Sequence, residues 1–325
     1  MRPSTIVCLL LSAMLLPAPA APAQVKLPPE THNAALRYWM ALADLQDPPS
    51  DKKTQELLEK TASGQVTWDE AKLGLILDKN TDAIEEMQRA TKLPECDWGL
   101  EYSRGARASI SYVTRARVLA RLNTLYGIRA MAKGQTQEAV DAWLDGVRFS
   151  QDLAKGGPLI FKLVARAALL SDFQSLTNAA QTGRLAAAQK AEVASAVRAL
   201  PADVFDWSEA LGLEEASLEL VIEELRQSKN PAAVYQELYG QPEPANFAVP
   251  SESEVIAFRT LISQAQEALH LPPAQAAPKL QHLQQRIGES RAELQIGVPS
   301  IMKINDARAE VEASRAQLLK ALGAS

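Results

Sequence analysis

The chain has 325 residues, of which 47% are hydrophobic and only 5% are aromatic, and its formal charge is −5. This length suits one large or two modest domains, with a core built mainly from Leu, Ala, Val and Ile. Because nucleic acid requires a strongly basic face, the acidic balance excludes nucleic acid as the main partner.

The N-terminus has the features of a cleaved signal peptide, which we place at residues 1–23. Arg2 supplies a positive start, residues 6–16 are apolar, and Ala21-Pro22-Ala23 is a small-x-small cleavage site. The apolar stretch has roughly half of the ~20 residues that a membrane span needs. We therefore expect cleavage after Ala23 and a periplasmic or secreted product. A retained membrane anchor and lipid attachment at Cys8 are the alternatives.

Cleavage would leave Cys96 as the only cysteine, which therefore cannot form an internal disulfide. Cys96 is then either a small buried apolar residue or, alternatively, a reactive thiol or one half of an intermolecular bridge. The most apolar later stretch, residues 159–170, is interrupted by Lys162 and Arg166. We therefore expect no transmembrane segment after signal cleavage.

An N-terminal helical region is expected over residues 24–107. Apolar spacing and capping signals predict three helices there. They run over residues 33–45, from Ser50 or Asp51 to residue 60, and from a Thr67 cap to Pro94.

An irregular segment, residues 94–105, follows these helices and carries Cys96, Trp98 and Tyr102. Exposed aromatic side chains on a loop would indicate a binding surface. The alternative is a loop that folds back over the helix ends.

The rest of the chain is also predicted to be helical, in a core region of residues 108–201 and a C-terminal region of residues 202–325. Gly and Pro breaks separate the predicted helices 109–133, 136–154, 159–180, 186–200, 203–227, 232–239, 252–269, 279–291 and 300–322. No useful length of chain alternates apolar and polar residues with the period of a strand. The predicted fold class is all-α, an irregular solenoid of antiparallel helix pairs.

The middle of the core region, residues 120–153, resembles a tetratricopeptide repeat, a helix–turn–helix unit of about 34 residues. Small and aromatic residues stand at the spacings that the repeat uses, namely Gly127, Gly134, Ala139, Trp143 and Gly146. The sequence departs from the family at Asn123, where Trp is usual, and at Ala130, where Tyr is usual. A tetratricopeptide-like hairpin in the middle of the solenoid is what this resemblance implies.

The order of features along the chain also resembles a group of exported bacterial proteins of unknown activity. The shared order is a signal, an Asn-Ala-Ala-x-x-Tyr-Trp helix, a Pro-x-Cys-x-Trp loop, an Arg-rich helix, a repeat-like hairpin and a Gly-Pro-Leu-Ile helix. This resemblance implies a helical fold and carries no activity or site residues.

Residues for catalysis or metal binding are few. The three histidines, His32, His270 and His282, form no compact metal-ligand spacing, and the sequence has no Gly-rich phosphate loop or nucleophile elbow. The sequence therefore assigns no catalytic residue, no metal ligand and no cofactor.

Residues 101–130 contain six arginines but only one acid. Arg117 and Arg121 are four residues apart and so share a helix face. Their planar guanidinium groups suit a carboxylate or phosphate, which makes them candidate residues for binding an anionic partner. The alternatives are plain solvation and internal pairing, for which residues 203–226, with eight acids and one base, are a natural complement.

Lys162 and Arg166 lie on the most apolar predicted helix, where an unpaired charge would be costly. Asp141 and Asp145, on the preceding helix, are the carboxylates that we expect to pair with them. A functional pocket around these two cations is the alternative.

The function that these features favour is a non-enzymatic module outside the cytoplasm that binds a protein or peptide. Stacked helix pairs present extended concave surfaces that suit such partners. An enzyme with a site between the helical halves is the alternative.

Overall fold

The computed structural model describes residues 30–110, 112–240, 242–244, 246–295 and 300–324. The chain divides into the residues up to Thr31 and a compact unit, His32–Ser325, to which the following description applies. The expected signal peptide, residues 1–23 with its cut after Ala23, lies outside the described residues.

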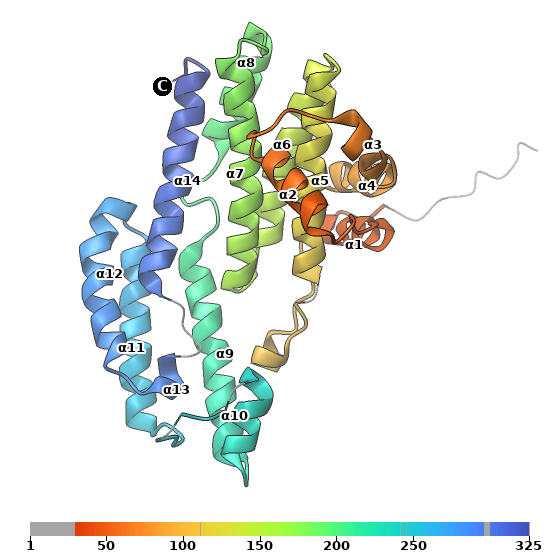
Figure 1. Cartoon of the computed structure of the whole chain (residues 1–325). Helices are drawn as coiled ribbons and strands as arrows, with labels where there is room; N and C mark the ends of the chain where they lie inside the picture. Colours follow the sequence, from red (N-terminus) through yellow and green to blue (C-terminus); the bar gives the residue numbers. More distant parts are fainter. Residues whose placement is uncertain (1–29, 111, 241, 245, 296–299, 325) are drawn as a thin grey trace, which may run out of the picture. The chain divides into compact units, whose positions relative to one another are not determined.

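The described part of the chain is helical and contains no strand, only an isolated bridge between Asn33 and Glu95, so the all-α prediction is confirmed (Figure 1). The N-terminal helices are α1 (Ala34–Asp44), α2 (Lys52–Ala62), α3 (Glu70–Asp78) and α4 (Thr81–Ala90), and a short 3₁₀ helix, η1, spans Tyr102–Arg107. Side-chain caps start three of these helices. Asn33 accepts a hydrogen bond from an N–H group of the first turn of α1, and Asp51 and Asp69 do the same for α2 and α3.

Four long helices form the middle of the unit: α5 (Tyr112–Ala132), α6 (Thr136–Ala154), α7 (Leu159–Gln181) and α8 (Ala187–Ala199). Helix α6 packs against both α5 and α7. A Cβ atom placed on Gly127 would lie 2.4 Å from Trp143 Nε1, so glycine lets α5 and α6 approach closely. Asn123 is fully buried, donates to the Ala142 carbonyl oxygen at 2.7 Å and accepts from Gln88 Nε2 at 2.9 Å. It thereby joins α5 to both α6 and α4.

The C-terminal helices are α9 (Trp207–Gln227), α10 (Pro231–Tyr239), α11 (Glu252–Leu269), α12 (Pro273–Gly288), α13 (Ala292–Gln295) and α14 (Ile301–Ala321). Helix α11 packs between α9 and α12, while α14 packs against α12 and returns to α7 (Figure 1). In a simple solenoid each unit touches only its neighbours along the chain. The contact of α14 with α7 joins distant segments, and the solenoid arrangement stays a prediction.

Some predicted helix boundaries are wrong, and α9, for example, begins at Trp207 rather than at residue 203. The third predicted helix is divided into α3 and α4 and is capped by Asp69 rather than Thr67. It breaks at buried Asn80, whose side chain accepts a hydrogen bond from the Gln46 N–H at 2.8 Å and donates one to the Ile76 carbonyl oxygen at 2.9 Å. Helix α12 begins at Pro273, six residues before the predicted start, and tolerates Pro278 in its second turn.

The loop that precedes α5 folds back over the core. Cys96 and Trp98 are each 5% exposed, and the Trp98 indole N–H donates to the Asp152 carbonyl oxygen at 2.7 Å. The Trp98 ring stacks on Tyr38 and on Tyr112. The folded-back interpretation is confirmed for these residues, whereas Tyr102 remains 51% exposed.

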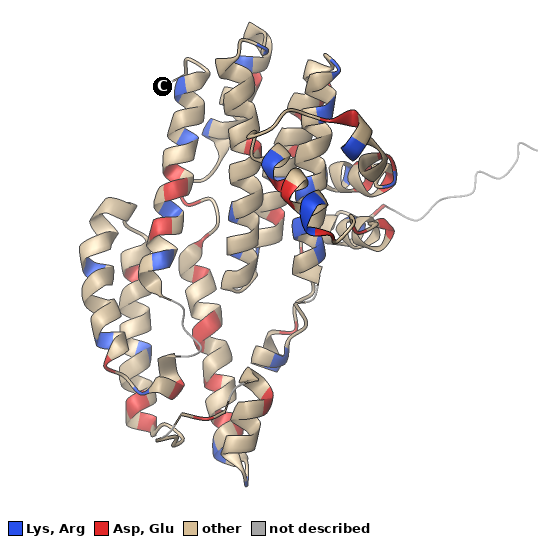
Figure 2. Cartoon of the chain, viewed as in Figure 1, with Lys and Arg blue, Asp and Glu red and all other residues tan. Residues whose placement is uncertain are grey.

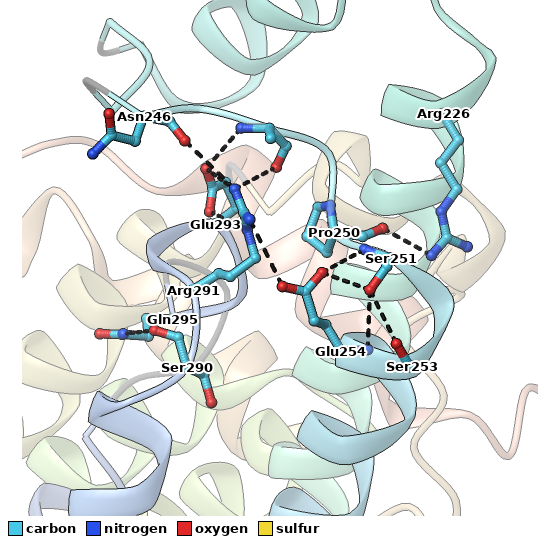
Figure 3. A network of polar contacts seen from close by, with 11 residues as sticks. Arg226, Asn246, Pro250, Ser251, Ser253, Glu254, Ser290, Arg291, Glu293 and Gln295 are labelled. Carbon is cyan, nitrogen blue, oxygen red and sulfur yellow. Dashed lines mark hydrogen bonds and ion pairs between the residues drawn. The ribbon is translucent and has the colours of Figure 1, made fainter.

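A polar network holds the segment before α11 to α13 (Figure 3). The Arg291 guanidinium lies between Glu254 and Glu293, with Nε 3.2 Å from Glu293 Oε2. Glu293 is buried and also accepts a hydrogen bond from the Ala248 N–H at 3.1 Å. Ser251 caps α11 and exchanges hydrogen bonds with Glu254. Side chains rather than regular structure therefore fix this connection.

No helix among the described residues is long and apolar enough to cross a membrane.

Candidate functional site

The six arginines of residues 101–130 fall into two groups. Four of them form ion pairs with carboxylates: Arg104 with Glu101, Arg107 with Glu224 and Glu237, Arg115 with Asp47, and Arg129 with Glu70 and Asp78. In the described part of the chain, Arg117 and Arg121 have no carboxylate within ion-pair distance.

The acidic run on α9 is therefore not the partner of these two arginines. Figure 2 shows acidic residues along α9, and Arg107 is the arginine of the 101–130 segment that reaches one of them, with Nη2 2.7 Å from Glu224 Oε1. Internal pairing is thus correct for Arg107 and wrong for Arg117 and Arg121, of which Arg117 is exposed to solvent and Arg121 is partly buried.

Arg117 and Arg121 line one cavity of about 230 Å³ between α2, α5 and α7. Their spacing of four residues on α5 places both on the same side of the helix, as the sequence predicted. The apolar wall of the cavity is made of small residues from all three helices: Ala62, Ala120, Ala167 and Ala168. The small side chains leave the space that the two arginines line.

Helix α2 completes this cavity. Its N-terminus is fixed by the Asp51 cap, and its C-terminal half buries Leu58, Thr61 and Ala62. Gln55 donates from Nε2 to the Pro49 carbonyl oxygen at 2.7 Å, which leaves its side-chain oxygen to accept a hydrogen bond of 2.9 Å from Arg121 Nη2. The polar partner of Arg121 is therefore a neutral amide.

Arg121 is held in an environment that disfavours its charge. Its Nε atom is buried and has no hydrogen-bond partner among the described residues. Burial lowers the pKa of Arg121, the neighbouring charge of Arg117 lowers it further, and Glu59 raises it. An arginine keeps its proton in proteins, so the effect is a partly buried positive charge, offset in part by Glu59, rather than a neutral side chain.

Glu59 lines the same cavity and was not identified from the sequence, nor were Gln55 and Thr124. They belong to α2 and to an inner position of α5, and no local pattern distinguishes them from other polar residues on helices. With two cations and one anion in its wall, the cavity has a net positive charge. An oxyanion of a ligand would supply the charge and the acceptor atoms that Arg117 and Arg121 lack.

Lys162 and Arg166 do not pair with Asp141 and Asp145, so that prediction is wrong. Lys162 Nζ lies 2.8 Å from Glu209 Oε2 on α9, and Arg166 pairs with Glu310 on α14. Because the short connection between α6 and α7 makes these helices antiparallel, Asp141 lies about ten residues, or roughly 15 Å, along α6 from the level of Lys162. Asp145 is instead paired with Lys92.

The three histidines are exposed, and the described residues contain no group of three or more His, Cys, Asp or Glu side chains placed to hold a metal ion. Cys96 is buried, and burial raises the pKa of its thiol to about 12. The burial of Cys96 is thus confirmed, and its low reactivity stays a prediction.

Comparison with known proteins adds no assignment: no family model, no curated protein and no solved structure matches this chain.

Proposed function

We propose that this chain is a non-enzymatic binding module that recognises an acidic peptide segment of a partner protein through Arg117 and Arg121. One observation carries the proposal: these two cations line a cavity, yet no carboxylate pairs with them in the described part of the chain. Burying the unpaired charge of Arg121 is costly, and a ligand carboxylate would offset that cost, while the exposed Arg117 would add a second guanidinium from the same cavity wall.

The proposed place of action is outside the cytoplasm, in the periplasm or the medium, because of the signal-like residues 1–23. The packing of α5 against α6 suits a tetratricopeptide-like hairpin, and α2 and α7 complete the groove that α5 lines. The choice of a peptide partner rests in part on analogy with other stacked-helix folds. Arg117 and Arg121 supply the groups that would bind the carboxylates of such a peptide.

The experiment is selection of short peptides from a random library by the immobilised, purified chain. The Arg117→Ala/Arg121→Ala variant is selected in parallel, and Arg104→Ala/Lys229→Ala serves as a matched control that removes the same charge from two exposed positions. We expect Asp- and Glu-containing peptides to be retained by the wild type and the control and to be lost from the arginine variant. Equal retention by the arginine variant would contradict the proposal.

A further inference from the structure

A second cavity, of about 500 Å³, lies where three turns of the chain meet. The turns follow α2 at Gly64, α5 at Gly134 and α7 at Gly183, and each glycine has a left-handed φ, of 73°, 78° and 70°. Such a backbone conformation is readily adopted only by glycine. The cavity is therefore framed by tight, defined turns, and its volume falls within the ~300–1,000 Å³ typical of small-molecule sites.

The wall of this cavity combines the apolar and aromatic residues Trp68, Ile128, Met131 and Trp143 with polar residues such as Ser175 and Asn178. Both indole N–H groups already have partners: Trp68 donates to Glu70 Oε2 at 2.7 Å, and Trp143 donates to the Thr124 carbonyl oxygen at 3.2 Å. The Trp68 ring, which is partly exposed, therefore has apolar surface to offer a ligand, whereas Trp143 is 2% exposed and lies within the wall. Aromatic surface of this kind favours a flat or hydrocarbon body.

Two polar groups of the wall are without partners in the described part of the chain. Thr61 is fully buried, and its hydroxyl oxygen has no hydrogen-bond partner. Arg184 is exposed at the turn after α7, and its guanidinium forms no ion pair or side-chain hydrogen bond there. Arg184 is also the one charged residue among the described residues that line the cavity.

We propose that this cavity binds a small carboxylic acid that has an apolar or aromatic body and a single negative charge. The body would pack against Trp68 and Met131, and the carboxylate would accept hydrogen bonds from Arg184, whose planar fork matches a carboxylate. One cation without a neighbouring anion in the wall favours a monoanion over a dianion. The site has no lining residue in common with the cavity of Arg117 and Arg121, so this inference does not rest on the proposed function.

The test is isothermal titration calorimetry of the purified chain with 2-naphthylacetate and decanoate, each compared with its neutral amide. We expect at least one acid to bind, and the corresponding amide to bind at least about tenfold more weakly. Arg184→Gln should reduce the affinity for the acid to that of the amide. Ala132→Phe should abolish binding of both, because Ala132 lines the cavity and is exposed, so that the larger ring fills the space.

Ala191→Phe is the matched control, since Ala191 is an exposed alanine of α8 outside the cavity. Equal melting temperatures of the two phenylalanine variants will show that Ala132→Phe folds. The proposal is overturned if neither acid binds, if an amide binds as tightly as its acid, or if Ala132→Phe binds as the wild type does.

Discussion

Lys162 on α7 donates a hydrogen bond of 2.8 Å from Nζ to Glu209 Oε2 on α9, although the Lys162 side chain is only 1% exposed. The Glu209 side chain is 44% exposed, so the pair joins a buried ammonium to a carboxylate that reaches water. Because the cation cannot reach solvent by itself, the carboxylate offsets the cost of burying it.

Removing the two partners of this pair should therefore have unequal effects. Glu209→Ala leaves a buried, unpaired ammonium, and we expect it to lower the free energy of unfolding by about 2–4 kcal/mol. Lys162→Met keeps the volume and leaves only a solvated carboxylate, with an expected loss below about 1.5 kcal/mol. Urea denaturation of the two variants measures both values. If Lys162→Met lost as much unfolding free energy as Glu209→Ala, or more, Glu209 would not serve to offset the burial of the Lys162 ammonium.

Asp172 should make the stability depend on pH. It is 1% exposed, its Oδ1 lies 2.7 Å from Thr124 Oγ1, and its Oδ2 has no partner among the described residues. Thr124 Oγ1 also lies 3.2 Å from the Ala120 carbonyl oxygen, and its single proton can be donated to only one of these acceptors. A neutral Asp172 that donates to Thr124 satisfies both, which agrees with the pKa of Asp172 being raised well above its usual value by burial.

A folded-state pKa above the unfolded value of about 3.9 means that the folded chain holds the proton more tightly. Asp172 therefore contributes its full stabilisation at a pH below its pKa in the unfolded chain. This stabilisation is lost as the pH rises through its pKa in the folded chain. Asp172→Asn imitates the neutral acid and removes this loss. We expect the variant to gain stability relative to the wild type between about pH 5 and about pH 8 in urea titrations. A constant difference over that range would exclude a protonated Asp172.

Gly127 should not tolerate a methyl group. Alanine gains up to about 1 kcal/mol over glycine in a helix interior, but its Cβ would lie 2.4 Å from Trp143 Nε1. We expect Gly127→Ala to lose about 1–3 kcal/mol through overpacking. Gly288 is the control, because a Cβ placed there meets no atom within 4 Å, and Gly288→Ala should be neutral or stabilising. Thermal unfolding of both variants measures these changes in stability. A Gly127→Ala variant as stable as the wild type would mean that α5 and α6 pack less closely.

Cys96 should be inert in the folded chain. It is 5% exposed, and burial raises its pKa to about 12, so little thiolate is present at neutral pH. In a Cys8→Ser background, where Cys96 is the remaining cysteine, a thiol-reactive disulfide reagent should modify the chain only after denaturant is added. Rapid modification of the native chain would contradict the burial of this residue.

Most of the fold follows from local signals. The predicted bounds of the helix after Gly134 agree with α6, and those of the helix 252–269 agree with α11, because capping residues and Gly or Pro breaks mark their ends. Asn80 was not recognised as a break because its effect depends on Gln46, a residue far from it along the chain.

The candidate site was predictable only in part. The spacing of Arg117 and Arg121 shows from the sequence that they share a face, but the absence of a carboxylate partner depends on how α2 and α9 pack. The partners of Lys162 and Arg166 come from α9 and α14, which no pattern within α7 indicates. Long-range packing, rather than residue type, decides which charges remain available to a ligand.

The most direct test of the central claim measures, on the same samples, the affinity for the tightest acidic peptide from the library selection and the melting temperature. Wild type, Arg117→Ala/Arg121→Ala and Arg104→Ala/Lys229→Ala are compared at about 50 mM and about 500 mM salt. The account predicts that the arginine variant alone loses binding with little change in melting temperature, and that salt weakens the wild-type complex. Unchanged binding together with a melting temperature several degrees lower would show instead that Arg117 and Arg121 hold the fold together.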